Sequence, residues 1–398
     1  MIPRFWPSLQ LLTQVRVSKR LSRNFEFRNV LPDFLSEDGF TDLLSLHQIL
    51  SSLHLPYEIT NRIMGIIEAL GKEISNWCYC HCVFFIDADL DYWDRIQWYS
   101  HGNINCLETA RAFIREENIN IGQRFNLACA YYLEADVRTL FQNMSASYRK
   151  YFSMMKYQFK SRSFWLDALQ TSTSLNWSEI SLAVVFDDFS FHDFGSVFHR
   201  NCLGLLELFP KLVHPEARLR SILNSLGSGE LHAFDLYLCL SKTEDPHLNN
   251  FFTRLSTEQL LNICLSFLHW PLQSLFLDIL GHFGRNMSVE FYLGLFKILL
   301  YEKFNAEWFD YDYVYLVKQI WSSLSHYIKS EIERDAIFPI LKQVLNLDRQ
   351  KPNSIKIIRM PSDKHKIVIH ADKSAGEHVR RLNTDLDEET VFKVGDQF

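Results

Sequence analysis

The sequence is poor in the two residues that mark tight turns, because only 14 of its 398 residues are glycine and 11 are proline. β-Sandwiches, propellers and glycine-rich nucleotide-binding folds need many such residues, so their scarcity disfavours those folds and favours helices. Hydrophobic residues make up 47% of the chain, which is enough to build a large core. We therefore expect a folded, helical protein.

A basic excess and a long apolar run are also lacking. The chain has 41 Lys+Arg against 47 Asp+Glu, for a formal net charge of -6, and DNA- or RNA-binding proteins usually show the opposite balance. The most apolar stretch, residues 260–280, is interrupted by polar residues and by Pro271, which is typical of a buried helical hairpin and not of a membrane span. We expect neither a nucleic-acid partner nor a membrane.

The eight cysteines do not form the dense pattern of a secreted disulfide scaffold. Five of them stand singly in apolar helical patterns: Cys106, Cys129, Cys202, Cys239 and Cys264. Scattered cysteines without a signal peptide predict reduced core thiols in a protein of the cytoplasm or nucleus.

Amphipathic segments of helical length alternate with short polar breaks through residues 41–350. We expect helices at residues 109–117, 121–133, 135–144, 215–226, 231–240, 257–268, 272–282 and 289–301. Ser256 and Gln259 have the spacing of a capping box, which begins one of these helices. No strict repeat period is present, so the prediction is an all-α fold, an irregular α-solenoid or multi-helix array.

The last segment, residues 351–398, differs in character from the array. Its first part alternates apolar and polar residues on either side of a turn at Pro361, which is a β-hairpin signal. The remainder is polar and of mixed charge, which is typical of a flexible tail.

Three clusters resemble metal or catalytic sites but lack a required feature. Cys78, Cys80 and Cys82 have a spacing of two, which turns neighbours to different faces of a helix, and no second pair follows. The acidic run at residues 87–91 lacks the glycine and glutamate of a calcium loop. The histidines, aspartate and cysteine of residues 192–202 match no known motif. We expect no metal, no cofactor and no enzymatic activity; an enzyme with a site around residues 78–82 or 192–202 is the alternative.

The N-terminal 25 residues are basic and amphipathic and contain no acid. This composition is typical of a mitochondrial presequence, so a mitochondrially targeted helical-repeat scaffold or binding protein is one interpretation. The segment also contains a more specific pattern, Ser/Thr-Leu-x3-Cys/Ser/Ala/Thr-x3-Ile/Leu/Val. Four residues fill its positions in register: Ser8, Leu9, Thr13 and Val17.

This pattern resembles the first helix of a SOCS box, and Gln10, Leu12, Lys19 and Leu21 agree with its commoner form. Pro7 and Ser8 can begin a helix, and the matching residues then lie on one face of it. A short helix with a single apolar stripe needs a groove to dock in. An ordinary first helix of the array is the remaining interpretation.

The resemblance implies that elongin C binds this helix, with Leu9 as the anchor. The contacting residues would be Ser8, Leu9, Leu12, Thr13 and Val17. A second, cullin-binding part of the box is similar to the segment with Leu31, Pro32 and Leu35, although Asp33 and Phe34 depart from the family pattern and leave the choice of cullin open.

The resemblance therefore implies three regions: a SOCS-box-like segment at residues 1–40, a target-binding array at residues 41–350 and a tail at residues 351–398. It further implies a non-catalytic adaptor, the substrate receptor of a cullin–RING ubiquitin ligase recruited through elongin B and elongin C. The array would bind a protein target that the sequence does not name.

Overall fold

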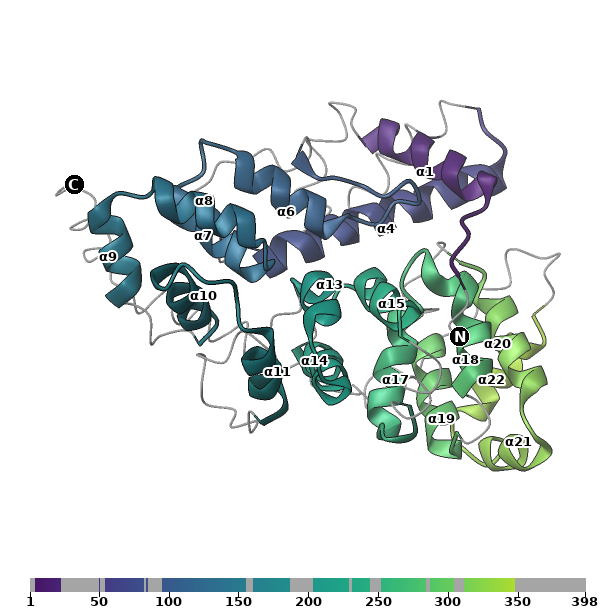
Figure 1. Cartoon of the computed structure of the whole chain (residues 1–398). Coiled ribbons are helices and arrows are strands. Elements are labelled where there is room, and N and C mark those ends of the chain that lie inside the picture. The colour runs from purple at the N-terminus through teal and green to yellow at the C-terminus, as the bar shows by residue number, and fades with distance from the viewer. Residues whose placement is uncertain are drawn as a thin grey trace, which may run out of the picture.

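The computed structural model describes residues 4–22, 50, 54–81, 84, 95–154, 160–186, 203–228, 231–243, 252–283, 287–303 and 311–347. These residues form an array of helices and no strand, apart from one isolated antiparallel bridge between Trp98 and Ile104 (Figure 1). The prediction of an all-α, multi-helix array is confirmed. The expected hairpin and tail at residues 351–398 lie outside the described residues.

The helices fall into two successive sets. The first comprises α1 (Leu9–Ser22), α4 (Tyr57–His81), α6 (Cys106–Arg115), α7 (Ile121–Ala130), α8 (Glu134–Asn143), α9 (Ala146–Met154), α10 (Lys160–Gln170) and α11 (Trp177–Phe186). The second comprises α13 (Leu205–Leu208), α14 (Pro215–Ser228), α15 (Ala233–Ser241), α17 (Thr257–Ser266), α18 (Phe276–Phe283), α19 (Val289–Ile298), α20 (Tyr313–Ser323), α21 (His326–Ile332) and α22 (Phe338–Leu345).

Side-chain caps explain why several helices begin where they do. The Ser256 hydroxyl accepts the Gln259 N–H at 3.2 Å and the Gln259 side chain accepts the Ser256 N–H at 3.0 Å, so the predicted capping box at α17 is confirmed. At α6 the Asn105 side chain accepts the Glu108 N–H, and at α7 the Asn120 side chain accepts the Gly122 N–H.

Two predicted helices are not continuous. The segment 272–282 begins as a 3₁₀ turn, Leu272–Leu275, before α18, and the segment 289–301 ends as a π turn, Leu299–Lys303, after α19. Leu272, Leu275, Leu299 and Leu300 are all buried, so tertiary packing holds these turns in non-α geometry that hydrophobic periodicity does not distinguish from an α-helix.

Two hydrophobic cores correspond to the two sets, and Leu208, Leu212 and Ala217, from α13 to the start of α14, join the first core. The first core includes Phe113, Phe125, Tyr131 and Trp165, and the second includes Phe267, Phe276, Phe296 and Leu316, all of them almost fully buried. Neighbours in sequence pack against each other, for example α6 with α7 and α7 with α8, which is the arrangement expected of stacked helices.

Helix α1 lies along α4 and is part of the folded array (Figure 1). Val15 is 1% exposed and packs with Leu70 of α4 and with Trp270 from the second set of helices. Ahead of α1, the backbone N–H of Phe5 donates a hydrogen bond of 2.6 Å to the Tyr237 hydroxyl in α15. The N-terminal segment therefore contacts both sets of helices.

A close backbone approach at Gly204, just before α13, gives a first testable prediction. A Cβ atom there would lie 2.3 Å from the Ala130 carbonyl oxygen and 2.6 Å from the Tyr132 ring. The backbone at Ala130 cannot move aside as a flexible side chain can. Gly204→Ala is therefore expected to lower the free energy of unfolding, measured by urea titration, by about 3 kcal/mol.

Gly281 in α18 is the matched control, because its Cβ would meet no atom within 4 Å. Gly281→Ala is expected to leave stability unchanged or raise it by up to about 1 kcal/mol, since alanine is the better helix former. Equal effects of the two substitutions would contradict the close approach at Gly204.

Candidate functional site

The first candidate site is the surface of α1, which carries the residues of the SOCS-box resemblance. Ser8 caps the helix, because its hydroxyl accepts the Leu11 N–H at 3.1 Å. Leu9, the first residue of α1, is 80% exposed. Thr13 is also exposed, and its hydroxyl donates to the Leu9 carbonyl oxygen at 2.8 Å. A helix that begins after Ser8 was predicted, and the structure confirms it.

The other two residues predicted to contact elongin C, Leu12 and Val17, are less accessible to solvent. Leu12 is half-buried and lies in a groove of about 400 Å³ that Arg16, Lys19 and Arg20 also line. Val17 is half-buried and packs against the small cluster of Leu50, Ile63, Met64 and Ile67. The predicted elongin-binding residues are thus mostly exposed in the first turns of α1, whereas Val17, farther along α1, packs against α4.

Several residues from the sequence-based hypotheses lie outside the described residues. These are Leu31, Pro32 and Leu35 of the cullin-side segment, together with Cys82 and residues 87–91 and 192–202. Cys78 and Cys80 lie half-buried in the last turns of α4. Cys106, Cys239 and Cys264 are buried, as predicted for core thiols, whereas Cys129 is half-buried.

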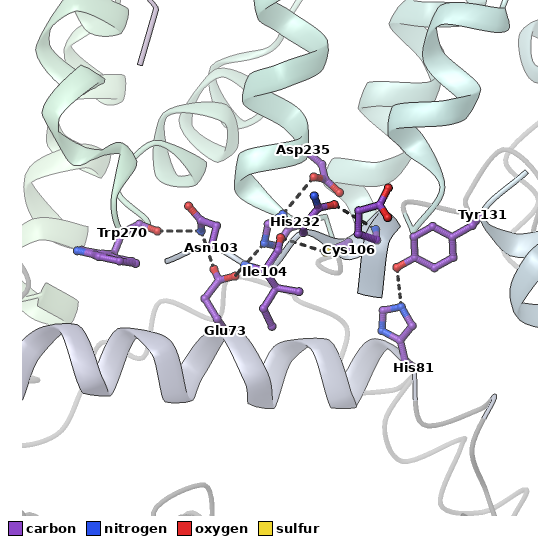
Figure 2. Close-up of polar contacts among 11 residues, drawn as sticks. Glu73, His81, Asn103, Ile104, Cys106, Tyr131, His232, Asp235 and Trp270 are labelled. Carbon is purple, nitrogen blue, oxygen red and sulfur yellow. Dashed lines mark hydrogen bonds and ion pairs between the residues drawn. The ribbon is translucent and has the colours of Figure 1, made fainter. Parts of the chain in front are cut away.

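The second candidate site is a polar cluster between the two sets of helices, formed by Glu73, Cys106, His232 and Asp235 (Figure 2). Glu73 comes from α4 and Cys106 is the first residue of α6. His232 is the N-cap residue of α15, and Asp235 lies in the first turn of that helix. Helix packing therefore assembles the cluster from three places in the chain.

His232 is the centre of this cluster. Its Nε2 lies 2.9 Å from Glu73 Oε2, and its Nδ1 lies 3.4 Å from Asp235 Oδ1. Glu73 also accepts the backbone N–H of Ile104 at 3.2 Å and the side-chain amide of Asn103 at 3.1 Å. These bonds fix the Glu73 carboxylate, which in turn holds the imidazole.

Burial and electrostatic interactions shift the pKa values of His232, Glu73 and Cys106. Burial alone would lower the pKa of His232, but the electrostatic interactions with Cys106, Glu73 and Asp235 outweigh burial and raise that pKa well above its usual value. Burial would raise the pKa of Glu73, but the His232 charge and hydrogen bond lower it. Burial raises the pKa of the Cys106 thiol to about 11. At neutral pH His232 is thus an imidazolium, with Glu73 on one side of the ring and Asp235 on the other.

His81 is a second buried histidine, and its pKa is lowered, whereas that of His232 is raised. His81, at the end of α4, has Nδ1 2.6 Å from the Trp77 carbonyl oxygen and Nε2 2.7 Å from the Tyr131 hydroxyl. Because a carbonyl only accepts, Nδ1 donates, and Nε2 accepts from Tyr131. Burial lowers the pKa of His81 to about 3. This histidine is neutral and joins α4 to the first core.

Comparison of the chain with protein-family models, with curated proteins and with solved structures finds no match in any of the three. Among the described residues, no helix combines the length and the apolar character needed to cross a membrane.

The sequence did not reveal the polar cluster, because Glu73 and His232 stand 159 positions apart. The only local signal is the pair His232 and Asp235, three residues apart at the start of a predicted helix. That spacing is common on helices and by itself indicates no site.

Proposed function

We propose that the protein is a non-catalytic adaptor that binds elongin C through the start of α1. With elongin B, this contact would recruit a cullin–RING ubiquitin ligase, and the helical array would bind the protein to be ubiquitinated. The observation that carries the proposal is Leu9, a large apolar side chain 80% exposed at the first turn of a helix anchored on its opposite face.

Anchoring matters because α1 has only 14 residues. A helix of that length is marginal in water and owes its stability to packing. Val15 and Leu11 supply that packing by contacting α4, so Leu9 is held in a helical conformation before any partner arrives. A preformed helix lowers the entropy cost of binding, which supports a docking role for its exposed side.

The surroundings of Leu9 also fit a partner surface that is apolar and acidic. Trp6, three residues earlier, is 78% exposed, so two large apolar side chains lie near the start of α1. Farther along the helix, the groove with Leu12 is lined by the cations Arg16, Lys19 and Arg20. Apolar anchors beside positive charge favour a partner with an apolar pocket and an acidic rim.

The contribution of such a receptor is positional. Holding the target near the ligase raises the effective concentration of its lysines at the site of ubiquitin transfer, while other subunits perform the chemistry. Leu31, Pro32 and Leu35 are the residues proposed for the cullin side, and the target-binding residues would belong to the array.

The packing of α1 also supports its retention in the mature protein. A cleaved mitochondrial presequence would take Phe5 and Val15 away with it, and Val15 is 1% exposed. Removal would uncover apolar side chains of α4, among them Ile66 and Leu70. Such exposure costs about 25 cal/mol for each Å² of apolar surface.

The experiment is co-purification of the full chain with elongin B and elongin C, beside a Leu9→Asp variant. A carboxylate forced into an apolar pocket is expected to weaken binding by roughly 100-fold, or about 3 kcal/mol. Because Leu9 is exposed, the helix content and unfolding midpoint of the variant should match the wild type.

Leu182→Asp is the matched control, since Leu182 is a 47% exposed leucine in α11, distant in sequence from α1. It is expected to bind like the wild type. Failure of the wild-type chain to bind, or equal loss in both variants, would refute the assignment of elongin C to α1.

A further inference from the structure

We infer that Cys106, His232 and Asp235 form a binding site for a zinc ion that joins the two sets of helices. One ligand atom from each residue, the sulfur, a ring nitrogen and a carboxylate oxygen, lies within 4.8 Å of the other two. Ligand atoms of a tetrahedral zinc ion lie roughly 3.5 Å apart, so small rotations of the side chains close the site.

Two of these atoms form an ion pair that falls short of hydrogen-bond geometry. His232 Nδ1 and Asp235 Oδ1 are buried and 3.4 Å apart, yet neither makes a hydrogen bond within the described part of the chain. Buried polar atoms are rarely left in this way, since each costs free energy. Once the imidazolium has lost its Nδ1 proton, a zinc ion between the two atoms satisfies both, because each then directs a lone pair toward it.

Glu73 binds the opposite ring nitrogen of His232 and orients the imidazole. Zinc-binding histidines commonly donate their other ring N–H to a carboxylate, which fixes the tautomer and orients the ring. Here the Nε2–H of His232 donates to Glu73 Oε2 at 2.9 Å, so loss of the second ring proton on metal binding leaves the lone pair on Nδ1, the nitrogen beside Asp235 (Figure 2). Glu73 is itself held by the Ile104 N–H.

The combination of sulfur, nitrogen and oxygen ligand atoms indicates which metal the site would bind. One thiolate, one imidazole and one carboxylate suit zinc, whereas calcium and magnesium prefer oxygen alone and copper(I) prefers sulfur. Binding releases the Cys106 thiol proton and the proton of the His232 imidazolium, so affinity rises with pH. His232 has a side chain 19% exposed, which gives the ion a route from solvent.

The site would act as a cross-link. Cys106 belongs to the first set of helices, while His232 and Asp235 begin α15 in the second set. A zinc ion would therefore tie two parts of the array that the chain connects only through a long path, and three protein ligands leave a fourth position for water. This role is independent of the elongin proposal.

The test uses the full chain, stripped with a chelator, reloaded with zinc chloride and desalted. The expected result is one zinc per chain by elemental analysis and a higher unfolding temperature with zinc. Cobalt(II) should give a near-ultraviolet thiolate charge-transfer band. Cys106→Ala is expected to lose the zinc, the band and the zinc-dependent stabilisation.

Cys264→Ala is the matched control, because Cys264 is an equally buried thiol within the second core. It should keep one zinc and the cobalt band. A third variant, Glu73→Gln, is expected to keep the site and weaken zinc binding about 10- to 100-fold, since it removes the charge that orients His232.

Two results would overturn the inference. If the wild-type chain holds no zinc after reloading, the four residues form an ion network only. If Cys106→Ala keeps its zinc while a variant lacking Cys78 and Cys80 loses it, the metal binds at the end of α4 and not at this cluster.

Discussion

Replacing His232 with alanine is expected to lower the free energy of unfolding by about 3–5 kcal/mol. The substitution leaves the carboxylates of Glu73 and Asp235 buried without the cation that lies within 2.9 Å and 3.4 Å of them. An uncompensated buried charge costs far more than the loss of a surface ion pair. Urea unfolding at pH 7 with a chelator present measures this effect without any contribution from metal.

A second substitution tests the cause. Asp235→Asn in the His232→Ala background removes one of the two unpaired charges and is expected to recover part of the lost stability. His326→Ala in α21 is the control, since His326 is exposed and should change stability by no more than about 0.5 kcal/mol. A His232 variant as stable as this control would show that the cluster is not electrostatically coupled.

Lowering the pH from 7 to 4.5 is expected to cost the wild-type protein about 3 kcal/mol more than it costs a His81→Gln variant. The pKa of His81 is lowered from 6.5 to about 3 in the folded protein. Between these values the unfolded chain binds a proton that the folded protein does not bind. The His81 contribution is therefore complete above pH 6.5 and is lost progressively as the pH falls toward 3.

Glutamine is the useful replacement because its amide can donate to the Trp77 carbonyl and accept from the Tyr131 hydroxyl, as His81 does, without titrating. The comparison uses urea unfolding of both proteins at pH 7 and pH 4.5. His232, whose pKa is raised, contributes stability below pH 6.5 that is lost as the pH rises, and this contribution cancels in the difference. Parallel pH curves would contradict the neutral, buried state of His81.

The helical nature of the fold could be read from local features. Scarce glycine and proline, helical periodicity and the capping box at Ser256 each depend on residues close together in sequence. The helix ends were less predictable where packing imposes another geometry, as at Leu272–Leu275 and Leu299–Lys303. Helix α13 was not predicted, because its four residues are too few for a periodic pattern.

On α1 the sequence predicted the helix and its start but not its orientation. Leu9, Leu11 and Leu12 are the same residue type within one turn, yet Leu9 is 80% exposed while Leu11 packs with Val15 in the contact with α4. A broad apolar stripe allows several rotations of the helix. The position of α4 selects one of them.

Periodicity, capping and composition are properties of neighbouring residues, so the amino-acid sequence predicts the all-α class, the start of α1 and the burial of thiols such as Cys106. The outward orientation of Leu9 and the contact among Glu73, Cys106, His232 and Asp235 depend instead on how the helices pack. These groups come from α4, α6 and the start of α15. Their meeting depends on the packing of helices far apart in the chain, which no local pattern records.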